Sequence, residues 1–204
     1  DFDSSVITRY GSQEGSKKGY NPQKPGRCSH HPLIAFVSDV KLVANMWLRS
    51  GDTGSSNNFL SFLEDTLAKL KNKTVSLVRL DSGFYSKEIF DYLEQRQLDY
   101  VVAAKFYQPI QHLISKQQAW LKINNGIEVT ETMYQGVEWD KPRRVVIVRQ
   151  LIKERPKAPG KMLRLFENDE LHQQYRYTAY VTNLKLAAAE VWRLFRGRGD
   201  AENR

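Results

Sequence analysis

The chain has 204 residues, 41% of them hydrophobic and 26% charged, which is the composition of a folded globular protein and excludes wholesale disorder. Its single cysteine, Cys28, excludes an internal disulfide and a cysteine-based zinc site, and no apolar run reaches the roughly 18 residues of a membrane span or resembles a secretory signal. The net charge of +8 favours a polyanionic partner, with nucleic acid ahead of an anionic membrane surface. We expect a cytoplasmic protein that has no membrane partner.

The first half of the chain alternates between predicted strands and helices. Leucines spaced three, four and three apart from Leu60 to Leu70 predict a helix that Ser55 or Ser56 can cap, and Ser86 is expected to cap a second one. The predicted elements are a strand end at 1–8, a basic Gly/Pro-rich loop at 9–32, strands at 31–37 and 40–48, a helix at 56–71, a strand at 75–80, a helix at 86–96 and a strand at 100–104. This order indicates an α/β core in which helices pack on a mixed sheet.

The second half has a different character. Strands are predicted at 126–135 and 143–151, paired around a tip at 136–142, with further strands at 162–166 and 175–182 and an amphipathic helix at 186–198. We therefore expect three parts: a first core segment at 1–107, a mostly β insertion at 108–174 and a last core segment at 175–204, whose strand can rejoin the core sheet. Because the chain starts without Met and ends inside what reads as a helix, we expect it to be a domain of a longer protein.

Three carboxylates stand out by their positions. Asp3 lies where the first strand ends, Asp81 directly follows the apolar strand at 75–80, and Glu202 lies one turn beyond Arg198 on the last predicted helix. Two strand-end acids and a helix-borne third acid suit a two-metal phosphodiester site, because Mg²⁺ prefers oxygen ligands and two ions about 4 Å apart stabilise both the attacking and the leaving oxygen. The alternative for each acid is a solvated surface group or a helix cap.

Three segments carry a family resemblance: DFDSSVITRYGSQEGSKKGYNPQKPGRCSHHPLIAF at the start, LRLDSGFY around Asp81, and VWRLFRGRGDAENR at the end. Together they resemble the catalytic domain of bacterial insertion-sequence DDE transposases of the cut-and-paste type. The resemblance implies a ribonuclease-H-like mixed sheet flanked by helices, with a β-rich insertion before the last catalytic helix. It implies that Asp3, Asp81 and Glu202 are catalytic and bind two Mg²⁺ (or Mn²⁺) ions. It also implies a double-stranded DNA substrate, a homodimer assembled on DNA and a place at the bacterial nucleoid.

The last helix carries more of this family's signature, which is Tyr, Arg three residues on, Glu four further and Lys seven further. Phe195, Arg198 and Glu202 fall on the first three positions. Phe195 lacks the hydroxyl that would contact a phosphate, so packing is the expected role. Arg198 keeps the bidentate donors that suit phosphate, and an i,i+4 pair with Glu202 is compatible with that role.

Two basic regions are candidate DNA contacts. The loop at 9–32 lies directly after Asp3, and the tip of the predicted hairpin places an indole among cations. In related transposases an aromatic residue of the insertion holds a flipped base, and Trp139 is the candidate here, with Trp120 as a competitor. The expected DNA-contacting residues are Arg198, Lys17, Lys18, Lys24, Arg27, Trp139, Lys141 and Arg143. The other readings are a solvated loop and an indole that covers its own hairpin, and His30 and His31 are expected to be structural.

Two alternatives remain open. DFDSS resembles the opening motif of haloacid-dehalogenase-like phosphatases, in which Asp1 would be the nucleophile, although Ser5 replaces the expected Thr or Val. A catalytically silent transposase remnant that grips DNA is the other, and the presence of all three acids argues against it.

Overall fold

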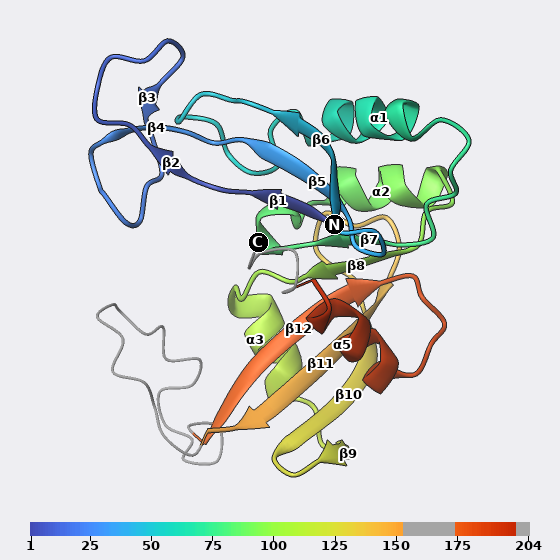
Figure 1. Ribbon diagram of the computed structural model, residues 1–204. Helices are drawn as coiled ribbons and strands as arrows, with labels where there is room; N and C mark the ends of the chain where they lie inside the picture. The colour runs from blue at the N-terminus through green and yellow to red at the C-terminus, as the bar shows by residue number, and fades with distance from the viewer. Residues whose placement is uncertain (153–173, 199–204) are drawn as a thin grey trace.

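The computed structural model describes residues 1–152 and 174–198. They form one nine-stranded mixed sheet with helices on both faces, and a small three-stranded sheet projects from one end (Figure 1). The strand orders are β6-β5-β1-β7-β8-β12-β11-β10-β9 and β2-β4-β3. The elements are β1 (Phe2–Ser4), β2 (Ile7–Thr8), β3 (Lys17–Lys18), β4 (Cys28–His30), β5 (Leu33–Val37), β6 (Leu42–Trp47), α1 (Phe59–Leu70), β7 (Val78–Leu80), the 3-10 turn η1 (Ser82–Phe84), α2 (Lys87–Gln95), β8 (Tyr100–Ala103), α3 (Gln108–Ser115), β9 (Leu121–Asn124), β10 (Ile127–Tyr134), β11 (Arg143–Leu151), β12 (Tyr175–Thr182) and α5 (Ala188–Arg196).

Side chains alternate strictly between the two faces of the large sheet. On β11, Val145 and Ile147 join the core under α1, α2 and α3, whereas Val146 and Val148 join a second, smaller core under α5. Both faces of a strand with such continuous apolar character must be covered, because each exposed side chain would forfeit its burial energy. The mixed α/β architecture flanked by helices is the one that the sequence predicts.

The strands of the predicted insertion continue the main sheet. β12 pairs with β8 on one side, with Val181 opposite Val102, and with β11 on the other. The last strand, β12, therefore lies in the same sheet as β8 and β7. The predicted strand at 162–166 lies outside the described residues.

Local signals gave mixed results at the helix ends. The Ser86 hydroxyl accepts a hydrogen bond from the Ile89 N–H and caps α2, as predicted. The predicted cap at Ser55 or Ser56 is wrong: α1 starts after Asn58, whose left-handed backbone (φ 59°) begins the helix without a side-chain cap. Helix α3, which was not predicted, begins with a proline in its first turn, where the missing N–H costs no hydrogen bond.

The predicted loop at 9–32 contains two short strands, β3 and β4, which complete the small sheet with β2. Gly51 allows the chain after β6 to pack closely against this sheet, because a Cβ at this position would lie 2.3 Å from both the Lys17 and the Ser29 carbonyl oxygens. No helix in the part of the chain that the structure describes is long and apolar enough to cross a bilayer.

Candidate active site

Asp3, within β1, and Asp81, directly after β7, lie side by side on the sheet. β1 and β7 run parallel with Phe2 opposite Leu80, so the residue that follows each partner reaches the same place on the sheet. Phe2 and Leu80 point into the core, with the Phe2 ring edge-on to Phe59. Because side chains alternate along a strand, the two carboxylates project from the other face.

Each carboxylate has one oxygen held by a local donor. The Ser5 hydroxyl donates to Asp3 Oδ2 at 2.9 Å, and the Gly83 N–H donates to Asp81 Oδ1 at 2.7 Å. Gly83 has to be glycine in this turn, because a Cβ would lie 2.8 Å from the Ser55 side chain and 2.9 Å from Asp81 Oδ1. The second oxygen of each acid is left to face the space between the two strands.

Arg198 fills that space. Its Nη2 donates to Asp3 Oδ1 at 3.1 Å and lies 3.8 Å from Asp81 Oδ2. The guanidinium is buried, and it arrives from the end of α5, which Arg79 anchors by donating to the Leu194 carbonyl. The structure thus brings together three of the predicted site residues.

The surroundings of Asp81 disfavour its ionised form. Burial raises the pKa of the Asp81 carboxyl above its ordinary value and the charge of Asp3 adds to the shift, while Arg198 and the Gly83 N–H oppose it. With a raised folded-state pKa, the contribution of Asp81 to stability is complete below the unfolded pKa of about 3.9 and is lost as pH rises through the folded value. At neutral pH the fold therefore carries a penalty for this carboxylate.

Replacing Asp81 by Asn should relieve that penalty, because the amide keeps an oxygen acceptor for the Gly83 N–H and has no charge. Without divalent metal at pH 7, we expect the melting temperature to rise by about 1–3 °C, and the gain to vanish below about pH 4. Thermal melts across this pH range, with Asp39→Asn at an exposed turn position as control, measure the effect. A lower melting temperature for Asp81→Asn at pH 7 would contradict it.

The donor set suits a divalent cation. Carboxylate oxygens are the ligands that Mg²⁺ and Mn²⁺ take, and a cation between Asp3 and Asp81 would offset the cost of ionising both. Within residues 1–152 and 174–198, no three His, Cys, Asp or Glu side chains are grouped closely enough to hold a metal ion. Glu202, the third predicted ligand, lies outside the described residues.

The predicted DNA contacts in the N-terminal loop are exposed. Lys17 and Lys18 form β3, with Lys17 paired to the exposed Asp52, and Lys24 and Arg27 lie on the turns before β4. Lys17 and Lys18 belong to the small sheet, and Lys24 and Arg27 lie on the loop that joins two of its strands. Their contact with DNA stays a prediction.

The structure places Trp139 in the interior, contrary to the exposed tip expected from the sequence. The indole is 6% exposed and packs edge-on against Phe90 and Tyr134. It has no free face for a base, because the hairpin folds down onto α2. Trp120 is partly buried, with Arg149 4.2 Å from its ring centre.

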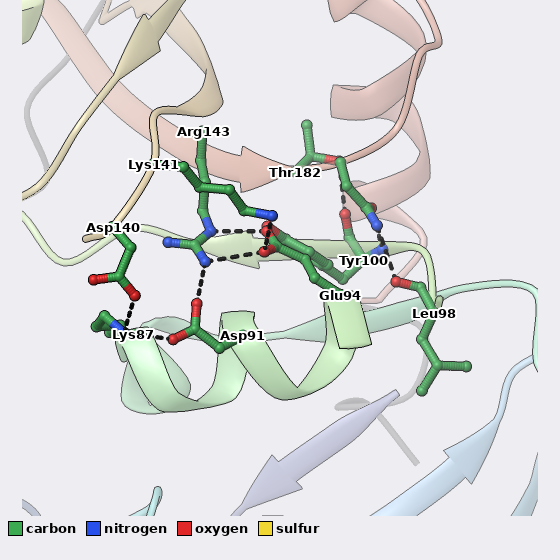
Figure 2. Close-up of polar contacts among 10 residues, drawn as sticks. Lys87, Asp91, Glu94, Leu98, Tyr100, Asp140, Lys141, Arg143 and Thr182 are labelled. Carbon is green, nitrogen blue, oxygen red and sulfur yellow. Dashed lines mark hydrogen bonds and ion pairs between the residues drawn. The ribbon is translucent and has the colours of Figure 1, made fainter. Parts of the chain in front are cut away.

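Arg143 is also interior and pairs with acids of α2 (Figure 2). Its guanidinium donates to both Glu94 oxygens and to Asp91, and lies 5.0 Å from the Trp139 ring centre. Lys141 is largely exposed and reaches Glu94 at 2.9 Å. This arrangement leaves Lys141 accessible to DNA and takes Arg143 out of reach.

Other expectations can be placed as well. Phe195 packs on Tyr180, with ring centres 4.5 Å apart, in line with the packing role. His30 is buried, accepts a hydrogen bond from Arg9 at Nδ1 and contacts the Glu14 carbonyl.

Arg79 is the residue that sequence reasoning missed. It holds both carboxylate oxygens of Asp1, at 2.5 and 2.7 Å, and it positions α5. The available signal was a cation inside the apolar strand VRL, since a buried arginine needs a carboxylate or carbonyl partner. With its oxygens bound in this way, Asp1 is a structural partner of Arg79 and is not presented as a nucleophile.

Comparisons with known proteins agree with this architecture. A family model described as transposase DDE domain group 1 matches residues 1–204. The cryo-EM structure of a piggyBac transposase synaptic complex with hairpin DNA is similar over 91% of this chain, with a TM-score of 0.51 and 13% sequence identity, which supports the fold. The chain spans only 33% of that transposase. A comparison with curated protein sequences finds no match.

Proposed function

The chain belongs to the transposase DDE domain family, group 1, and we propose that it hydrolyses phosphodiester bonds at transposon ends and transfers the released DNA strands to target DNA. The observation that carries the proposal is the pairing of Asp3 and Asp81 on neighbouring parallel strands around Arg198 Nη2. DDE transposases generally use divalent metals, and these two acids have the required chemistry.

We assign Asp3, Asp81 and Glu202 as the ligands of two Mg²⁺ or Mn²⁺ ions. When bound, such ions act as Lewis acids that activate water or a 3′-hydroxyl and stabilise the leaving oxygen. The Ser5 hydroxyl and the Gly83 N–H hold one oxygen of each aspartate, which fixes the direction of the other. Arg198 would donate to a nonbridging phosphate oxygen and hold the phosphodiester beside the acids.

In this proposal, DNA approaches the site along the basic residues of the N-terminal loop and small sheet. The exposed Lys17, Lys18, Lys24 and Arg27 would contact phosphates next to the scissile one, with the small sheet as their support. Two copies would assemble on a pair of transposon ends. We propose that residues 108–174 form the insertion and that residues 1–107 and 175–204 form the catalytic core.

Binding of Mn²⁺ tests the metal assignment directly. In titration calorimetry we expect saturable binding to the wild type that is weakened in Asp3→Asn and Asp81→Asn by more than the 10–100-fold typical of losing an outer-shell partner. Asp39→Asn, exposed on the turn before β6, should bind like the wild type.

Two results would contradict the assignment. Unchanged binding in both variants would place the metal elsewhere. Absence of binding to the wild type, with and without a DNA duplex, would favour the alternative of a silent DNA-binding domain.

A further inference from the structure

A groove lies beside α5 on the face of the sheet that this helix only partly covers. Helix α5 lies over β10 and β11 (Figure 1). Beside the helix, a cavity of about 300 Å³ is lined by residues of α5 and of β10, β11 and β12. Strand β12 supplies Arg176, Thr178 and Tyr180 to its lining, and α5 supplies Trp192 and Arg196. Asp3 and Asp81 do not line it.

The charged side chains that line the groove, Arg176 and Arg196, are both positive. No acidic residue is among the described residues that line it, and neither Arg176 nor Arg196 forms an ion pair within residues 1–152 and 174–198. Neighbouring arginines differ in this respect: Arg149 on β11 pairs with Glu128, and Arg193 on α5 pairs with Glu190. Within the described part of the chain, no carboxylate therefore occupies the donors of the two groove arginines.

The residues that line the groove suit a phosphate group. Arg196 lies over the Trp192 ring at 5.0 Å, which holds the guanidinium at the groove wall. Burial raises the pKa of the Tyr180 hydroxyl, and Arg176 and Arg196 oppose that rise, so both cations act at the same point. The hydroxyl of Thr178 and the amide of Gln150 add hydrogen-bonding groups.

We propose that this groove binds the phosphodiester backbone of DNA at a place separate from the catalytic carboxylates. The inference rests on the proposed function for the identity of the polyanion, and on the two unpaired arginines for the site. DNA is favoured because the chain carries a net charge of +8 and guanidinium groups match phosphate oxygens bidentately. Arg196 also lies two residues before Arg198, which contacts Asp3. The same helix end therefore links the groove to the candidate active site, and one DNA molecule can contact both.

The double variant Arg176→Gln/Arg196→Gln tests the groove by fluorescence anisotropy with a labelled random-sequence DNA duplex. The two losses should weaken binding about tenfold at low salt and reduce the slope of log affinity against log salt by about 1–2, since each phosphate contact contributes about 0.9. Both arginines are exposed, so the variant should melt like the wild type.

A charge-matched control separates a local contact from net charge. Arg96→Gln/Arg193→Gln removes two exposed arginines that are already paired with Glu64 and Glu190, and it should change the affinity and the salt slope much less. Equal effects of the two double variants, or none in the groove variant, would overturn the proposal. Displacement of the duplex by poly-glutamate in the wild type but not in the groove variant would also overturn it, in favour of an acidic protein partner.

DNA affinity and DNA cleavage distinguish a wrong groove proposal from a wrong proposed function. Asp81→Asn should retain the groove's contribution to DNA affinity. If the complete protein cleaves DNA while the groove variant binds normally, the groove proposal fails alone. If no cleavage occurs but the groove variant loses affinity, the groove stands and the catalytic proposal fails.

Discussion

Replacing Asp81 by Asn in the complete transposase should lower the rate of Mg²⁺-dependent cleavage of transposon-end DNA by about 10³-fold or more. Asparagine keeps the size of the side chain and an acceptor for the Gly83 N–H, so the turn after β7 should persist. It removes one of the two charges that neighbouring strands place together. Stabilisation of transition-state charge by a bound ion is worth several kcal/mol, and each 1.36 kcal/mol is a factor of about ten in rate.

The measurement is a single-turnover cleavage assay on labelled transposon-end DNA with Mg²⁺, beside DNA binding by the same proteins. Affinity for DNA should be unchanged or slightly higher in Asp81→Asn, because a negative charge near the phosphate has been removed. Asp39→Asn is the control for an acid at an exposed turn. If Asp81→Asn cleaves at a rate within about tenfold of the wild type, the loss is far below what a metal ligand implies, and the catalytic assignment fails.

The position of Asp81 was predictable from the sequence because it directly follows the short apolar strand β7, whereas Asp3, expected at the end of the first strand, lies within β1. Their contact was not predictable, since it depends on β1 pairing in parallel with β7 across more than seventy residues of chain. The local pattern of apolar residues indicates where a strand ends, but it does not indicate which other strand pairs with it. The position of Arg198 next to both acids depends on the same long-range pairing and on the anchoring of α5 by Arg79.

Strands with clear alternation were predicted well, and contacts between distant elements were not. β12 begins and ends where the pattern YRYTAYVT does, because its two faces meet two different cores. Trp139 was misplaced because its burial depends on Phe90 of α2, far away in sequence. The hairpin tip is exposed, as the sequence indicates, but its Trp139 indole is covered by packing that no local signal reports.

Truncating Arg143 to Ala should destabilise the protein by about 3–5 kcal/mol, the usual cost of removing one partner from a buried ion pair. The Arg143 side chain is 2% exposed and joins the β10–β11 hairpin to α2 through Glu94 and Asp91 (Figure 2). Its loss would leave Glu94 without its main partner, would leave Asp91 with Lys87 alone of its two cations, and would uncover the Trp139 and Phe90 rings that the guanidinium lies over. The melting temperature should fall by about 6–20 °C, at about 2–4 °C per kcal/mol for a chain of this size.

Acid should weaken the same network. Burial would raise the pKa of Glu94, but hydrogen bonds from Arg143, Lys141 and Tyr100 outweigh it and lower the pKa to about 2. The stability that Glu94 contributes is therefore present above its unfolded pKa of about 4.3 and is lost as pH falls towards 2. In Arg143→Ala this part of the acid sensitivity should shrink, because the largest of the three hydrogen-bond contributions is gone.

Chemical denaturation at pH 7 and pH 3 measures both effects, with Arg96→Ala as the matched control. Arg96 makes an exposed pair with Glu64, so its removal should cost less than about 1 kcal/mol. DNA affinity decides between the structural role and the DNA contact that the sequence indicates. If folded Arg143→Ala is as stable as the wild type but binds DNA more weakly with a reduced salt slope, the side chain acts on DNA. Lower stability with an unchanged slope places Arg143 in the architecture that holds the insertion against α2.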